Sequence, residues 1–215
     1  MALPSPVVNL YTLSKYDFYK KEPKIEKDTS VADRLARLSF KFLYERRHED
    51  QRCRHLTGAF TCSFNLLSIQ EHNHPHLLLL QIGNTFHKLP GGRLKPGENE
   101  IEGLKRKLTS KIGFNFPDRV PDWQIGECVA RWWRPNFERY VYPYCPNITE
   151  PKECRMIYMV HLSGTEYFAV PQNLKLLAVP FFELYDNAQR YGTIISKIPH
   201  QLSRFQFNMI NNNNN

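Results

Sequence analysis

Residues 92–114 read GRLKPGENEIEGLKRKLTSKIGF, and the fold is decided in this stretch. It begins with a turn rich in glycine and proline and continues with apolar residues at helical spacing: Ile101, Leu104, Leu108 and Ile112. Basic residues occupy other positions of the same segment, so the expected helix is amphipathic and has one face suited to a core. Gly113 is placed to end the helix. The pattern predicts a tight loop followed directly by an amphipathic helix.

Strand-like segments lie on both sides of this loop and helix. They are rich in apolar and β-branched residues and occupy residues 56–64, 66–69, 77–82, 129–133 and 156–162. A histidine- and asparagine-rich turn at 71–76 favours a solvated hairpin loop over a metal site. Helical patterns are expected at 31–42, with caps offered by residues 28–30, and at 181–188 and 201–205. Strands mixed with helices in this way predict an α/β fold.

The division of the chain follows from these patterns and from its composition. With 215 residues and 41% hydrophobic content, the chain is long enough for one domain with a sizeable core and an extension. Residues 1–55 are expected to form an N-terminal arm and a helix that pack on the core, and residues 56–207 the main domain. Residues 208–215 form an asparagine-rich tail, which is expected to be disordered because it can bury nothing.

Charge and cysteine content restrict the partners and the compartment. Lys and Arg number 29 against 21 Asp and Glu, which favours RNA, phosphates or acidic membrane surfaces without choosing among them. The five cysteines are widely spaced and form no C-x-x-C pair, so they are interpreted as reduced thiols. No signal peptide and no apolar run long enough to span a membrane is found. We therefore expect a protein of the cytosol or the nucleus that does not enter a membrane.

The segment 92–114 resembles the Nudix box, a loop and helix that runs Gly, five residues, Glu, seven residues, then Arg-Glu-apolar-any-Glu-Glu-any-Gly-apolar. The matching residues, in one register without a gap, are Gly92, Glu98, Arg106, Leu108, Gly113 and Phe114. The resemblance implies a Nudix-type α/β/α sandwich, here with an N-terminal extension. It also implies, in the enzymes of the family, a magnesium site on the helix.

The three helical glutamate positions of the box are occupied by Lys107, Ser110 and Lys111. Positions related as i, i+3 and i+4 share one helix face, and a hard dication needs clustered carboxylate oxygens there. Two ammonium groups and a hydroxyl supply none. We therefore expect no catalytic residues, no metal and no cofactor. The lysines either attract a phosphate directly or form a solvated basic face.

The remainder of the chain resembles the small subunits of pre-mRNA cleavage factor I, also called subunit five of the cleavage and polyadenylation specificity factor. The resemblance covers nearly everything from Asn9 to Phe207, and its most distinctive runs are 132–138 and 183–188. Other matching runs are residues 9–11, 21–23, 26–28, 86–92 and 151–153. It implies a nuclear homodimer that binds single-stranded RNA carrying the element UGUA, near the 3′ end of pre-mRNA. It also implies a larger cleavage factor I subunit with an RNA-recognition motif as partner.

The same resemblance implies which residues contact RNA. They are Glu26, Arg34, Thr85, Phe86, Leu89, Tyr191 and Gly192. Two positions depart from the family pattern: a second glutamate is replaced by Phe64, and a second aromatic residue by His87. These departures leave the exact base preference open. Whether the box also holds a nucleotide without turnover is open as well.

The chemistry of these residues suits RNA apart from any resemblance, although each also has an ordinary structural explanation. Unstacked bases bind by stacking on aromatic rings and by hydrogen bonds to their edges, and Arg supplies a planar fork of donors. Phe86 could instead pack in the core, Arg34 could be a surface charge, and residues 191–192 could be a simple turn. Trp132 and Trp133 are adjacent in a strand and should point to opposite faces, one toward the core and one toward a possible dimer interface.

Three classes of function compete on this reading. They are a sequence-selective RNA-binding subunit, a Nudix hydrolase of dinucleoside polyphosphates, and a non-catalytic dimeric scaffold. The residues that replace the box glutamates argue against the hydrolase. Phe86, Arg34 and the formal charge of +8 favour RNA binding over a scaffold alone.

Overall fold

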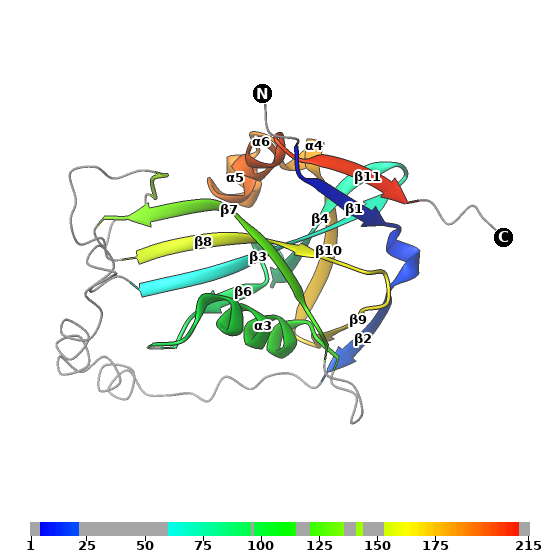
Figure 1. The fold of residues 1–215 in the computed structure, drawn as a ribbon, viewed down its shortest axis with the longest axis horizontal. Coiled ribbons are helices and arrows are strands. Elements are labelled where there is room, and N and C mark those ends of the chain that lie inside the picture. The colour runs from blue at the N-terminus through cyan, green and yellow to red at the C-terminus, as the bar shows by residue number, and fades with distance from the viewer. Residues whose placement is uncertain are drawn as a thin grey trace.

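A mixed β-sheet forms the centre of the computed structural model, which describes residues 5–21, 60–95, 97–114, 121–135, 141–143 and 153–210 (Figure 1). Within these ranges the sheet has seven strands in the order β10-β4-β3-β8-β7, with β5 paired to β4 and β6 paired to β3. β3 and β8 run parallel, and the other pairs are antiparallel. The strands are β3 (Phe60–Glu71), β4 (His74–Ile82), β5 (Phe86–Lys88), β6 (Gly91–Arg93), β7 (Gln124–Arg134), β8 (Glu153–His161) and β10 (Leu174–Pro180).

Helices cover both faces of this sheet. α3 (Glu100–Lys111) lies on one face, and α4 (Phe181–Leu184), α5 (Ala188–Tyr191) and α6 (Ile198–Leu202) lie on the other, as Figure 1 shows. The α/β/α sandwich predicted from the sequence is therefore confirmed. No helix in the described ranges is both long enough and apolar enough to cross a membrane.

The leucine run of β4 shows why the sheet needs two covering layers. Leu77 and Leu79 pack in a cluster with Leu184 and Leu202 from the α4–α6 side. Leu78 and Leu80 point the other way and pack in a second cluster, together with Leu108 and Ile112 of the α3 side and the rings of Trp123 and Phe168. Successive strand residues face opposite sides, so a continuous apolar run is buried only when both faces are covered.

The N-terminal arm contributes two strands to the domain. β1 (Val7–Tyr11) pairs in parallel with β11 (Gln206–Ile210), and β2 (Asp17–Lys21) pairs in parallel with β9 (Tyr167–Pro171). A 3-10 helix, Leu13–Lys15, joins β1 to β2. Val8 and Leu10 are buried in the cluster on the α4–α6 side. Within the described residues 5–21, β1 is thus a part of the core.

The pairing of β1 with β11 corrects the expected start of the disordered tail. Residues 208–210 lie in β11, and the Nδ2 of Asn208 donates to the Oδ1 of Asn9 at 3.1 Å. A polar composition did not prevent strand formation, because the backbone of β1 supplies the hydrogen bonds. Residues 211–215 and the predicted helix at 31–42 with its caps lie outside the described residues.

Two predicted helices differ in extent from those observed. The expected helix at 181–188 is divided into α4 and α5, because Asp186 has a φ of +54° and Asn187 caps α5 by accepting from the N–H of Arg190 at 3.3 Å. The expected helix at 201–205 is α6 at Ile198–Leu202, preceded by a 3-10 helix, Ile195–Lys197. The cap at Asn187 decides the break between α4 and α5, and apolar spacing does not show it.

The predicted hairpin is present, but its histidine-rich turn is shorter than expected. His72 and Asn73 have φ values of +50° and +62°, a conformation typical of a two-residue turn between antiparallel strands. β4 already begins at His74, and His76 is buried with its Nδ1 2.9 Å from the carbonyl oxygen of His74. The description of the segment as solvated therefore holds for the turn and fails for His76.

Candidate functional site

The loop and helix of segment 92–114 form as the periodicity predicts. α3 begins after Asn99, whose Oδ1 accepts hydrogen bonds from the N–H groups of Ile101 at 2.9 Å and Glu102 at 3.4 Å. Leu104 and Leu108 are fully buried, whereas Ile101 is 36% exposed and lies at the edge of the apolar face. The apolar face is therefore narrower than the sequence pattern suggests.

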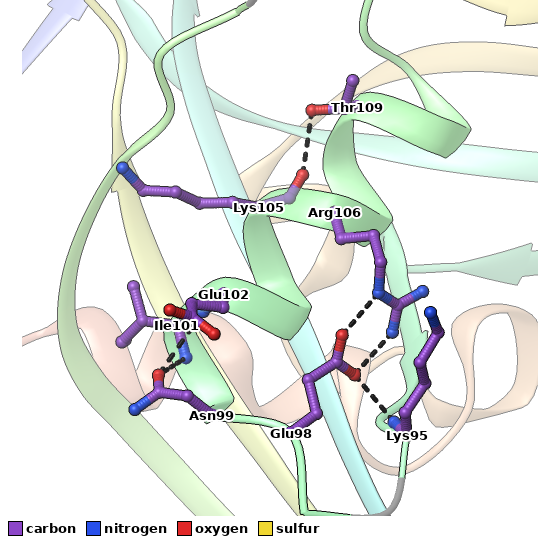
Figure 2. Close-up of polar contacts among 8 residues, drawn as sticks. All are labelled: Lys95, Glu98, Asn99, Ile101, Glu102, Lys105, Arg106 and Thr109. Carbon is purple, nitrogen blue, oxygen red and sulfur yellow. Dashed lines mark hydrogen bonds and ion pairs between the residues drawn. The ribbon is translucent and has the colours of Figure 1, made fainter.

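Glu98 and Arg106 clamp the loop to the helix, as Figure 2 shows. The Nε of Arg106 donates to the Oε1 of Glu98 at 2.5 Å, and its Nη2 donates to Oε2 at 2.6 Å. The backbone N–H of Lys95 adds a third hydrogen bond at 2.7 Å. The Arg106 hydrogen bonds, with help from Lys95, lower the pKa of Glu98 to about 2. This carboxylate is thus committed to an ion pair within the box.

A glycine in the helix allows the loop to approach. A Cβ at Gly103 would lie 2.3 Å from the Cδ2 of Leu94 and 3.0 Å from the Oε2 of Glu98. The next carboxylate, Glu100, accepts a hydrogen bond from the hydroxyl of Tyr158. Burial raises the pKa of that phenol, and the contact with Glu100 raises it further. Two of the acidic groups around the start of α3 therefore hold structure together.

The three positions that replace the box glutamates lie on α3 as half-buried side chains. Lys107 reaches across to β6, where its Cε would be 3.6 Å from a Cβ on Gly92. Ser110 and Lys111 follow one turn later at the end of the helix. Among the described residues, no group of three or more His, Cys, Asp or Glu side chains is placed to hold a metal ion.

A second group of candidate side chains lies at the C-terminal end of β4, where the chain turns into β5. Thr85 and Phe86 are exposed there, and the Phe86 ring has 60% of its surface accessible. Leu89, which follows β5, is buried in the cluster that also contains Tyr191. The core-packing explanation for Phe86 is therefore wrong, because the strand presents its ring to solvent.

Tyr191 connects this turn to the helical layer. Its ring lies 4.9 Å from the ring of His87, centroid to centroid, and its hydroxyl donates to the Oε1 of Glu183 at 2.5 Å. Burial is the main cause that raises the pKa of Tyr191, and together with the hydrogen bond to Glu183 it raises this pKa to about 12. Arg190 donates to the same Glu183 oxygen at 2.8 Å. Next to Tyr191, Gly192 is exposed, with a φ of +84° and open space where a Cβ would point.

The structure thus brings the segment that carries Thr85, Phe86 and Leu89 to α5, because His87 contacts the Tyr191 ring and Leu89 shares a cluster with Tyr191, about a hundred residues away in the sequence. Glu26 and Arg34 lie outside the described residues, and so does the side chain of Phe64. The support that Glu183 and Arg190 give to Tyr191 was not predicted from the sequence. The matching run 183–188 was the available signal, because it contains the acid two helical turns before the tyrosine.

His87, identified from the sequence as a departure, is buried against Tyr191 rather than exposed with Phe86. Its Nδ1 has no hydrogen-bond partner among the described residues. Trp132 and Trp133 do point to opposite faces. Trp132 is buried on the α4–α6 side, and the partly buried Trp133 packs near Leu104 of α3.

A family model covers most of the chain. A Nudix_2 family model, described as nucleotide hydrolase, matches residues 6–205. The NUDIX domain of NrtR from Shewanella oneidensis, solved with ADP ribose, is 15% identical, with a TM-score of 0.46 over 80% of this chain and 96% of that one. The fold and the loop–helix site define the chain as a protein of the Nudix class.

Two curated relatives are similar over almost their whole length. Pre-mRNA cleavage factor Im 25 kDa subunit 2 of Arabidopsis thaliana is 67% identical over 96% of this chain and 98% of that protein. Cleavage and polyadenylation specificity factor subunit 5 of Dictyostelium discoideum is 45% identical over 95% of this chain and 99% of that protein. The chain belongs to the family of these 25 kDa cleavage factor subunits, within the wider Nudix family.

Proposed function

We propose that this chain is a sequence-selective RNA-binding subunit of the nuclear machinery that cleaves and polyadenylates pre-mRNA. The observation that carries the proposal is the exposure of Phe86 at the start of β5, the strand whose next residue, His87, packs on Tyr191. An aromatic ring presented to solvent by a rigid strand suits stacking by an unpaired base. The names of the relatives, which are subunits of a pre-mRNA cleavage factor and of a polyadenylation factor, support the same function.

In the proposed site, Phe86 stacks on one base and the backbone around Gly192 leaves room for its neighbour. Glu183 and His87 hold the Tyr191 side chain in place. This side chain therefore loses little conformational entropy when RNA binds. Glu26 and Arg34 are proposed to read base edges, as the family resemblance implies. A second copy of the chain and a larger subunit with an RNA-recognition motif complete the proposed assembly.

The chain is further proposed to hydrolyse no nucleotide. Lys107, Ser110 and Lys111 offer no carboxylate, and Glu98 and Glu100 are already hydrogen-bonded to Arg106 and Tyr158. The hydrolase alternative is tested by measuring phosphate release from diadenosine tetraphosphate in Mg²⁺ or Mn²⁺. Turnover that disappears in Glu98→Gln would support the hydrolase and contradict this part of the proposal.

RNA binding is tested with a UGUA-containing oligomer and a scrambled oligomer of the same composition. Phe86→Ala should weaken UGUA binding by roughly 1–3 kcal/mol, the cost of one stacked base, and Phe86→Trp should retain most of it. Phe182→Ala is the matched control, because Phe182 is another exposed phenylalanine, 70% accessible, on α4. Arg34→Ala should mainly reduce the preference for UGUA.

Equal binding of the two oligomers by the unaltered protein would refute the selective function. A general basic scaffold would also respond differently to substitution. In that case Lys107→Glu with Lys111→Glu would weaken binding most, and Phe86→Ala would behave like Phe182→Ala.

A further inference from the structure

Two arginines share one buried carboxylate at the end of the sheet, where β7 finishes and β8 starts. The Nη2 of Arg134 is 2.7 Å from the Oε2 of Glu153, and the Nη2 of Arg155 is 3.1 Å from the same oxygen. The carboxylate is almost fully buried, while about a third of each arginine side chain is accessible. Two cations therefore accompany one anion, and the trio carries one positive charge more than its internal pairing neutralises.

The donors of these arginines are not all used. The Nε atoms of both Arg134 and Arg155 are buried and have no hydrogen-bond partner among the described residues. A buried donor without a partner costs free energy, and in a native protein each such group calls for an explanation, of which a bound water or ion is one. Guanidinium groups bind phosphate oxygens through paired N–H donors. The chemistry of the trio is that of a phosphate site.

This trio lies on the same side of the sheet as Tyr191. In the register of β7 with β8, Trp132 is opposite Arg155 and Arg134 is opposite Glu153. Opposed residues project from one face, and Trp132 packs in the cluster that contains Tyr191 and Leu89. Figure 1 shows α5 on the β7 side of the sheet, nearer the middle of β7 than its end.

Further basic groups extend from the trio toward α5. The Nζ of Lys197, in the 3-10 helix that follows α5, is 5.6 Å from the centre of the Trp132 ring. Arg93 of β6 occupies the same row of the sheet as Arg155, because both are paired with position 62 of β3. Arg93 and Arg155 thus share one cross-strand row, and Lys197 lies over Trp132, the next residue of that row.

We propose that Arg134 and Arg155, with Lys197 at the margin, form a phosphate-binding subsite for the sugar–phosphate backbone of RNA. The inference rests on the proposed RNA-binding function. It adds to that function a group of residues that bind RNA without regard to base identity. Glu153 pairs with both guanidinium groups and offsets one of their two positive charges. The subsite therefore contributes equally to UGUA and scrambled RNA, and its contribution falls with salt.

The experiment measures RNA affinity against salt concentration for both oligomers. Arg155→Gln leaves the Arg134–Glu153 ion pair in place, and Arg134→Gln leaves the Arg155–Glu153 pair, so the fold is retained in each. Each variant should lose about tenfold in affinity at low salt and about 0.7 in the slope of log affinity against log salt. The ratio of UGUA to scrambled affinity should stay unchanged.

Two further variants separate a phosphate site from a structural ion pair. Glu153→Gln removes the shared anion and should strengthen RNA binding at low salt and steepen the salt dependence, whereas a structural role predicts weaker binding. Lys105→Gln removes one positive charge from α3, on the other face, where Lys105 pairs with Asp122 at 3.2 Å, and should leave the slope as it is. Thermal unfolding confirms that each variant is folded.

The outcomes are distinguishable from those of the proposed function. The subsite would be overturned if Arg155→Gln and Arg134→Gln had the same slope of log affinity against log salt as Lys105→Gln, even if the protein preferred UGUA. Weaker binding in Glu153→Gln would overturn it as well. Loss of the UGUA preference in the unaltered protein, with the slopes changed as expected, would refute selective recognition and leave the subsite standing. A titration with ATP shows whether the phosphate comes from a nucleotide or from RNA. If Arg155→Gln weakened ATP binding and left RNA binding unchanged, the assignment to RNA would be overturned.

Discussion

Gly113 is required at the end of α3 for a reason that differs from the one the sequence suggests. A glycine after a helix commonly adopts a left-handed conformation, but Gly113 is not among the glycines with positive φ. A Cβ on it would lie 2.7 Å from the Cα of Thr109 and 3.0 Å from the carbonyl oxygen of that residue. Its place beside Phe168 of β9, to which it is bridged, requires this close approach.

Gly113→Ala should therefore destabilise the domain by about 1–3 kcal/mol, the usual cost of forcing extra volume into a packed site. Gly97→Ala is the control, because Gly97 has a φ of +69° and open space around it. Its cost is conformational only, about 1 kcal/mol. Urea unfolding of the two variants measures the difference, and a larger loss in Gly97→Ala would show that packing against Thr109 is unimportant.

Individual side chains of the candidate site were predictable in identity but not in arrangement. The exposure of Phe86 could not be read from the sequence, because a strand phenylalanine is usually buried and only the edge position of β5 leaves it accessible. The contact of His87 with Tyr191 joins residues from β5 and α5, and no local pattern encodes it.

At the scale of elements, the contact between the box loop and α3 is held by charge. The ion pair of Glu98 with Arg106 has two hydrogen bonds, and the Glu98 side chain is only 13% exposed. Its pKa is lowered from the usual 4.5 to about 2. A lowered folded-state pKa contributes stability that is complete above about 4.5 and is lost as the pH falls toward 2.

Glu98→Gln should thus cost about 1 kcal/mol of unfolding free energy at pH 7, and this difference from the unaltered protein should shrink below pH 4.5. Glu127→Gln provides the comparison, because Glu127 makes a single contact with Arg204 at 3.0 Å and half of each side chain is exposed. It should cost less at every pH. A Glu98→Gln deficit that stays constant down to pH 3 would mean that the carboxylate charge does not stabilise the loop.

Elements with a sustained pattern were predictable, and those defined by distant pairing were not. The apolar spacing of Leu104, Leu108 and Ile112 located α3, and the leucine run located β4. The pairing of β1 with β11 depends on segments at opposite ends of the chain, and neither carries a strong alternation of its own. The break between α4 and α5 depends on Asp186, whose left-handed conformation is set by its surroundings.

For the molecule as a whole, the family resemblance leads us to expect a homodimer in solution. The described surface also exposes large aromatic side chains, among them Tyr185 after α4, which water solvates poorly. Light scattering across micromolar concentrations should give about twice the 25.4 kDa mass of the chain. A mass of one chain at every concentration would rule the dimer out.

The parallel pairing of β1 with β11 has a consequence for synthesis in the cell. Val8 and Leu10 leave the ribosome long before their partners, Phe207 and Met209. The nascent chain must therefore carry the apolar residues of β1 without their strand partner until β11 has been synthesised, although domains otherwise tend to fold from the N-terminus during synthesis. The core closes only after β11 has emerged, and until then β1 is a natural target for a chaperone.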